Sequence, residues 1–257
     1  MKSLKIFLFL FVICGCVSLF GQDALPEGIQ QGEVGTPPAL MSQLAVLAGL
    51  SILPFAVMLL TSYVKIVVVL ALLRNALGVQ QSPPNQVLNG IALIMTFYVM
   101  FPTGLAMYNA ASEAIDKNPP KELFTGAAAT YLIDVIDAGK EPLRDFLQRN
   151  TIGKHITSFY QLAYRSYPEE FRSSLKQTDF LVIIPAFITS QLKAAFEIGV
   201  VIYLPFFVID LVTSNILLAM GMMMLSPLTI ALPLKLLLLV MVDGWTILIQ
   251  GLVLTFR

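Results

Sequence analysis

Two long stretches of this chain are almost free of charge. Residues 41–112 hold two charged side chains and residues 180–257 hold six, whereas residues 113–179 hold nineteen. The apolar stretches are long enough to cross a bilayer as helices of about 20 residues. Only 12% of the whole chain is charged, against about 25% in a typical soluble domain. The sequence therefore predicts an all-α, membrane-associated fold of helical hairpins with broken helices and an extracytoplasmic helical insertion.

The N-terminal 21 residues have the layout of a secretory signal peptide. Lys2 and Lys5 precede a short apolar core, and small residues follow that favour cleavage after Gly21. A retained membrane helix and a lipoprotein-type cleavage before Cys16 are the alternatives. Residues 22–42 are polar and rich in Gly and Pro, which predicts a flexible lead-in.

Few residues in this chain could perform covalent chemistry. Both cysteines, Cys14 and Cys16, lie in the leader, and His155 is the single histidine. Disulfides, thiolate metal sites and a histidine cluster are therefore excluded from the mature chain. His155 lies in a polar stretch without a nucleophile motif, which favours a surface histidine over a catalytic one. With a net charge of zero, nucleic acid is not an expected partner. These residues favour neither an enzyme nor a metal or cofactor site.

Residues 43–112 are predicted to form a helical hairpin. An apolar run over 44–73 is followed by a second over 86–111. Between them, Gly78 is a typical helix stop. Pro83 and Pro84 prevent the first helix from continuing and favour a new helix start.

Residues 180–257 form a second apolar region, in three segments at 180–203, 206–220 and 228–256. Prolines such as Pro205 and Pro233 lie at or inside these segments, and each removes a backbone donor. We therefore expect broken helices packed against protein rather than rods facing lipid.

The polar residues 113–179 show apolar side chains at helical spacing. Pro142 would suit the first turn of one such helix. If both apolar runs before this region cross the bilayer, it lies on the extracytoplasmic side.

Six charged residues interrupt the apolar segments, namely Asp243 and five others. A charge at the bilayer centre costs roughly 2.5–3.5 kcal/mol on insertion scales, so each needs a partner, water or an interface to which it can snorkel. One pair four residues apart can meet on one helix face. Three of the others must pair between segments or between subunits, or line water. The five are Lys193 with Glu197, and Lys65, Asp210 and Lys235.

The stretch from Met220 to Met224 holds four methionines, interrupted by Gly221. Methionine is flexible and fills irregular space, so a loop of this composition could close around objects of different shape. Ordinary helix packing is the alternative, and composition alone favours it slightly.

Several motifs resemble the FliP/SctR family of bacterial type III secretion proteins. The resemblance covers residues 43–256 and includes Leu204–Leu211, Gly221–Met224, Leu232–Leu236 and Val242–Trp245. Two stretches, Ser214–Leu218 and Gly244–Thr246, are more similar to the injectisome branch, SctR, than to flagellar FliP. The hallmark is the hairpin turn, with Arg74, Asn75, Gly78, Gln80, Gln81, Pro83, Pro84 and Asn85.

The resemblance implies a core subunit of the export gate in the bacterial inner membrane, within the secretion basal body. Five copies would assemble with SctS/FliQ-like and SctT/FliR-like subunits, contact other export apparatus proteins and lipid, and pass unfolded proteins. It also implies roles for single residues. Met222, Met223 and Met224 would form a pore gasket, and Lys65, Asp210 and Lys235, with Lys193 and Glu197, an inter-subunit charge network.

One position departs from the pattern. Many members have Glu where this chain has Gln191, and whether Glu197 supplies the missing charge is left open. The two positions do not share a helix face.

Three other functions remain as alternatives. They are a flagellar export gate, a secondary transporter or ion channel that works as a single chain, and, more remotely, a membrane-embedded enzyme.

Overall fold

The fold is described from a computed structural model of residues 1–257, in which residues 51–52, 54–79, 83–117, 126–222 and 224–256 are described. The chain divides into residues 1–51 and 52–257, and the helices below belong to the second unit. The predicted signal peptide and lead-in lie outside the described residues. So do Gln80, Gln81 and Met223 of the predicted sites.

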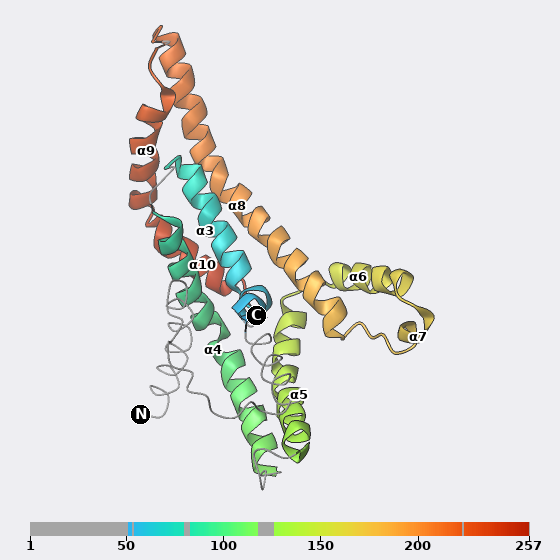
Figure 1. Ribbon diagram of the computed structural model, residues 1–257. Helices are drawn as coiled ribbons and strands as arrows, with labels where there is room; N and C mark the ends of the chain where they lie inside the picture. Colours follow the sequence, from blue (N-terminus) through green and yellow to red (C-terminus); the bar gives the residue numbers. More distant parts are fainter. Residues whose placement is uncertain (1–50, 53, 80–82, 118–125, 223, 257) are drawn as a thin grey trace, which may run out of the picture. The chain divides into compact units, whose positions relative to one another are not determined.

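The described residues are helical and contain no strand, which confirms the predicted all-α class (Figure 1). A short helix at Pro54–Leu60 precedes the labelled helices. These are α3 (Tyr63–Leu77), α4 (Asn85–Lys117), α5 (Gly126–Arg149), α6 (Gly153–Ser166), α7 (Glu169–Arg172), α8 (Phe180–Ala219), α9 (Pro227–Met241) and α10 (Gly244–Leu254).

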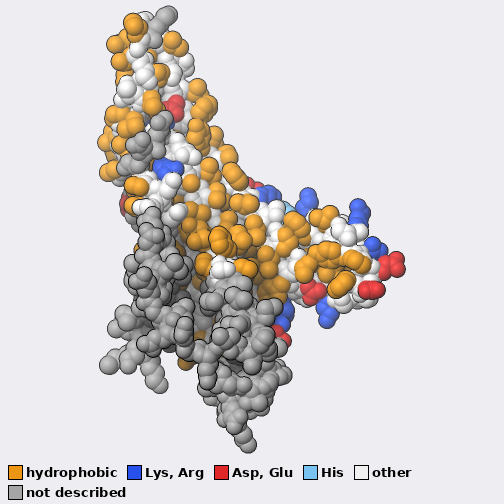
Figure 2. Space-filling view, in the orientation of Figure 1, with side chains coloured by type: hydrophobic (Ala, Val, Ile, Leu, Met, Phe, Trp, Pro, Cys, Tyr) orange, Lys and Arg blue, Asp and Glu red, His pale blue; other side chains and the backbone are white. Residues whose placement is uncertain are grey.

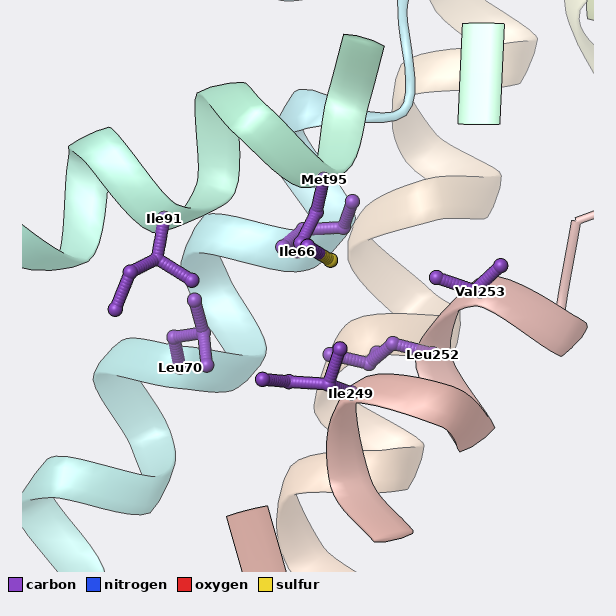
Figure 3. Close-up of a pocket in the computed structure, with 7 residues that line it drawn as sticks. All are labelled: Ile66, Leu70, Ile91, Met95, Ile249, Leu252 and Val253. Atoms are coloured by element: carbon purple, nitrogen blue, oxygen red, sulfur yellow. The ribbon is translucent and has the colours of Figure 1, made fainter. Parts of the chain in front are cut away.

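Helices α3 and α4 form the predicted hairpin. Helix α3 ends at Gly78, whose φ of 77° is left-handed and whose N–H bonds to the carbonyl of Asn75. Helix α4 starts directly after Pro84. Apolar side chains of α3 and α4 point toward one another and toward α10, without room for a water molecule between them (Figure 3). They are Ile66, Leu70, Ile91, Met95, Ile249, Leu252 and Val253.

Helix α8 runs for 40 residues without the break expected at Pro205. A proline in a helix frees the carbonyl four residues earlier. That residue is Leu181 for Pro185 and Val201 for Pro205, and both are exposed. The lost hydrogen bonds therefore fall on the outer face of the helix, and the tightly packed inner face stays regular.

Two sharp bends supply the broken helices. Helix Pro54–Leu60 meets α3 at 76°, and α9 meets α10 at 62° across Asp243, whose φ is 51°. Asparagine and aspartate tolerate this left-handed conformation better than other non-glycine residues. By length and composition, Asn85–Glu113 and Phe180–Ala219 could each cross a membrane, and each bent pair could form one further span.

The polar region contributes α5, α6 and α7. Pro142 lies inside α5 and not in a first turn, which corrects the predicted helix start. Phe146 and Leu147 of α5 are buried against Ile183 and Phe187 of α8, so the apolar stripe anchors this region to the long helix.

His155, expected at the surface, is half-buried and lies 2.7 Å from the hydroxyl of Ser190 on α8 through Nδ1. The polar sequence around His155 gave no sign of this contact with α8, because Ser190 lies 35 residues away.

Candidate functional site

Lys235 of α9 forms hydrogen bonds to two other helices of the chain. Its side chain is 3% exposed, and its Nζ donates to Asp210 Oδ2 of α8 at 2.7 Å. The same nitrogen donates to the carbonyl oxygen of Ala76 at 3.0 Å. Ala231 and Leu239, one turn away on either side, are buried as well, so Lys235 points into the protein on the packed face of α9.

The environment of Lys235 suits a cation. Ala76 lies in the last turn of α3, where free carbonyls form the negative end of the helix dipole. Asp210 supplies a full negative charge, and its side chain is 36% exposed. The ammonium group therefore joins α3, α8 and α9 inside one chain, and part of the Asp210 carboxylate remains open to the outside.

Lys65 of α3 has different surroundings. It is 4% exposed. Its Nζ donates to Thr255 Oγ1 at 3.1 Å and lies 3.7 Å from the ring centre of Phe256. An aromatic face attracts an ammonium group, most strongly where water is excluded. No carboxylate among the described residues pairs with Lys65.

Lys193 and Glu197 lie one turn apart on α8, with Nζ and Oε1 3.6 Å apart and side chains 53% and 65% exposed. Gln191, by contrast, is buried and donates from Nε2 to the carbonyl of Asn150 at 2.7 Å. Glu197 therefore does not occupy the place of Gln191. The five predicted charges lie in three separate places, and among the described residues only Asp210 and Lys235 form an ion pair between two helices.

The hairpin turn is held by side chain and backbone together. The Arg74 guanidinium bonds to the Asn85 side-chain oxygen across the turn. A Cβ at Gly78 would approach Leu228 Cδ1 to 3.1 Å, and its φ disfavours any other residue. Pro83 and Pro84 lie between the two helices, as the sequence predicted.

The methionine stretch is the loop between α8 and α9 (Figure 1). Gly221 has a φ of 72° and its N–H bonds to Leu218 O, while Met222 N–H bonds to Leu217 O. These two bonds form a Schellman motif, which ends a helix firmly. The side chains beyond the motif are open, because Met222 is 45% exposed and Met224 is fully exposed. The loop thus presents thioethers from a rigid helix end.

Sequence reasoning missed the partners of the two buried lysines. Ala76 contributes only a backbone oxygen, so its side chain gave no signal. Thr255 lies 190 residues from Lys65, and nothing in the local pattern linked them.

Much of the second apolar region remains uncovered by the chain. Figure 2 shows hydrophobic side chains over much of the visible face of α8 and α9. Beside the bend of α9 and α10 lies a groove with a volume of about 410 Å³, lined almost wholly by apolar residues from α3, α8, α9 and α10. Monomeric soluble proteins rarely expose contiguous apolar surface of this extent, so lipid or other protein must cover it.

Comparison with known proteins gives a consistent result. The FliP family model matches residues 46–252. The chain is 46% identical to "Pathogenicity-related ORF2" of Xanthomonas campestris pv. glycines, over 83% of this chain and 95% of the relative. It is 44% identical to "Hypersensitivity response secretion protein HrcR" of Ralstonia nicotianae, over 84% and 97%. It is 45% identical to "Yop proteins translocation protein R" of Yersinia pestis, over 85% and 97%.

Proposed function

The chain belongs to the FliP family, in its injectisome branch SctR, and from this we propose that it is a core subunit of the type III secretion export gate. It would form, with SctS- and SctT-like partners, the channel through which unfolded proteins cross the bacterial inner membrane. Relatives named as secretion and translocation proteins support a role in the type III export apparatus.

The uncovered apolar surface supports assembly with other subunits. The single observation that carries the proposal is the combination, on the α8–α9 hairpin, of exposed apolar faces with an exposed methionine loop. Neighbouring copies, five in the proposed ring, would cover the apolar faces of the hairpin. Lipid would cover what remains, and residues 113–179 would lie on the extracytoplasmic side.

In the proposed assembly the charges join subunits. Asp210 already holds Lys235 with one oxygen, and the exposed part of its carboxylate can accept a bond from a neighbouring chain. Lys193 and Glu197 are exposed on α8 and can pair with charges of a neighbouring chain. Lys65 is 4% exposed, so it is the member of the proposed network least open to a neighbouring subunit. We expect Asp210→Ala to disrupt the complex, and intact complexes in a native gel would count against the charge network.

The loop of Met222, Met223 and Met224 would form the gasket of the pore. Thioether side chains are flexible enough to seal against each other and to adapt to a passing polypeptide. The Schellman motif at Gly221 holds the end of α8 fixed, so that the side chains move while the helix stays in place.

Conductance tests the gasket. The triple variant M222A, M223A, M224A should assemble normally with its partners and raise the ion leakage of membranes that contain the closed gate. Met241→Ala is the matched control, because Met241 is 77% exposed but lies at the far end of α9. Unchanged conductance in an assembled triple variant would remove the gasket role.

An ion channel or secondary transporter is the competing function, because it too would use broken helices and buried charges. It predicts transport by this chain alone in liposomes. The export gate instead predicts that the purified chain elutes as an oligomer together with small SctS- and SctT-like subunits. A stable monomer that conducts ions without partners would refute the export gate.

A further inference from the structure

Several polar residues lie between two apolar clusters along the helices that contribute to both clusters. One cluster contains Ile66, Val69 and Ala195, and the other contains Ile183 and Phe187. On α8, Ser190 and Gln191 lie between Phe187 of the second cluster and Ala195 of the first.

A similar order holds at the start of α3. Leu60 packs against the second cluster, Ile66 belongs to the first, and Ser62 and Lys65 lie between them in sequence. At the C-terminus, Phe256 contacts both clusters. The polar layer is therefore Ser62, Lys65, Ser190 and Gln191, with the exposed Thr255 at its edge.

Two atoms of this layer are buried without a hydrogen-bond partner among the described residues. They are Ser62 Oγ, on a residue with 0% exposure, and Gln191 Oε1, on a residue with 2% exposure. Lys65 adds an ammonium group whose partners are one hydroxyl and an aromatic face, so at least one of its three donors is unused. Ser62 and Lys65 are three residues apart and share a helix face. Buried polar groups are almost always satisfied, so the layer calls for a further partner.

The chemistry of the three groups decides what that partner is. A cation would be repelled by Lys65. An anion would suit Lys65 and Ser62 but would meet the oxygen of Gln191. That amide cannot turn round, because its NH₂ group already donates to Asn150 O at 2.7 Å. Water both accepts and donates, and buried waters typically make about three hydrogen bonds.

We propose that an ordered water occupies the polar layer, accepting a hydrogen bond from Lys65 and linking Ser62 Oγ to Gln191 Oε1. It would join α3, α8 and the C-terminal residues at the level where helix Pro54–Leu60 bends by 76° into α3. Insertion of water is one of the recognised causes of a sharp helix bend. The neighbouring α3–α4–α10 contact, by contrast, leaves no room for water.

A double-mutant cycle tests the water, using the full chain purified with its export-gate partners. Ser62→Ala should lower Tm by about 2–4 °C, because it removes a hydrogen bond to the bridging water. Gln191→Met should lower Tm further, because it also removes the hydrogen bond from Nε2 to Asn150 O. Together they should lower Tm by less than the sum, because both act on one water. In a dry layer, removing an unsatisfied hydroxyl would leave Tm unchanged or raise it.

The control for the cycle is Thr213→Val. Thr213 is buried, and its hydroxyl donates to Ile209 O within α8, so its effect should add to that of Gln191→Met without coupling. An unchanged or raised Tm in Ser62→Ala, or additivity of the Ser62 and Gln191 changes, would overturn the proposal.

Two further measurements decide the matter if the variants fail to assemble. A map of the unaltered complex at about 2 Å should show density within hydrogen-bond distance of Ser62 Oγ, Gln191 Oε1 and Lys65 Nζ, and an empty position would refute the water. Replacing chloride by gluconate should leave Tm unchanged. A Tm that depends on chloride would show that the site holds an anion instead. Neither measurement depends on protein export, so the proposed function stands or falls separately.

Discussion

Replacing Asp210 by alanine leaves the buried ammonium group of Lys235 without a carboxylate partner. The structure indicates how much stability this change should cost. Lys235 is 3% exposed and would keep only the Ala76 carbonyl as a partner. Removing one partner of a buried ion pair costs about 3–5 kcal/mol. Because the Asp210 side chain is 36% exposed, the pair is only partly desolvated, and we expect the lower end, about 3 kcal/mol. This corresponds to a fall in Tm of about 6–12 °C for a chain of this size.

The two members of the pair should not be equivalent. Lys235→Met leaves Asp210 with access to solvent and removes a cation from the C-terminal end of α3, which is worth about 0.3–1 kcal/mol. We therefore expect Lys235→Met to lower Tm less than Asp210→Ala. Combining Lys235→Met with Asp210→Ala should recover part of the loss, because no buried charge is then left unpaired.

Thermal unfolding of the detergent-purified chain measures these differences. Glu197→Ala is the matched control, because it also removes a carboxylate of α8 paired with a lysine, but from a pair that is 3.6 Å apart and mostly exposed. Exposed pairs contribute about 0–1 kcal/mol. If Asp210→Ala and Glu197→Ala lowered Tm equally, or if the double variant were less stable than Asp210→Ala alone, burial would not be the source of the effect.

Two glycine positions give further predictions. Gly78→Ala should destabilise the chain by about 1 kcal/mol or more, because its φ is 77° and the new Cβ would lie 3.1 Å from Leu228 Cδ1. Gly90→Ala, with open space around it, should leave Tm unchanged or raise it, and equal losses at the two positions would contradict the argument. Gly199→Ala should cost about 1–3 kcal/mol by overpacking, because its Cβ would lie 2.2 Å from Leu72 Cδ1. Adding Leu72→Ala should recover part of that loss in the same unfolding assay, and no recovery would place the strain elsewhere.

The sequence predicted local features well where a residue type has one backbone preference. Gly78 ends α3 and Pro84 precedes α4, as expected, because left-handed φ and a missing N–H act within a few residues. The prediction that the helix breaks at Pro205 was wrong, because α8 continues through that residue. Whether a proline breaks a helix depends on where its freed carbonyl points, and that is set by packing against α3 and α9.

The buried charges also show that contacts between distant residues could not be predicted from the sequence. Their positions in apolar runs predicted that they need partners, but the sequence could not choose among the possible partners. Lys235 finds Asp210 on another helix and a backbone oxygen of Ala76, and a backbone oxygen has no signature in sequence. Lys65 finds Thr255 and an aromatic ring, a combination that pairing rules between opposite charges do not cover.

The position of Lys235 restricts how the methionine loop can move. One nitrogen binds both Asp210 and the end of α3, and a slide of α9 by one residue is about 1.5 Å. Such a slide would lengthen both hydrogen bonds of Lys235 at once. It would leave the ammonium group unpaired among apolar residues. Lys235 therefore fixes the register of helix α9. Any movement of the methionine loop before α9 would involve rotation of side chains and local backbone, not translation of the helix.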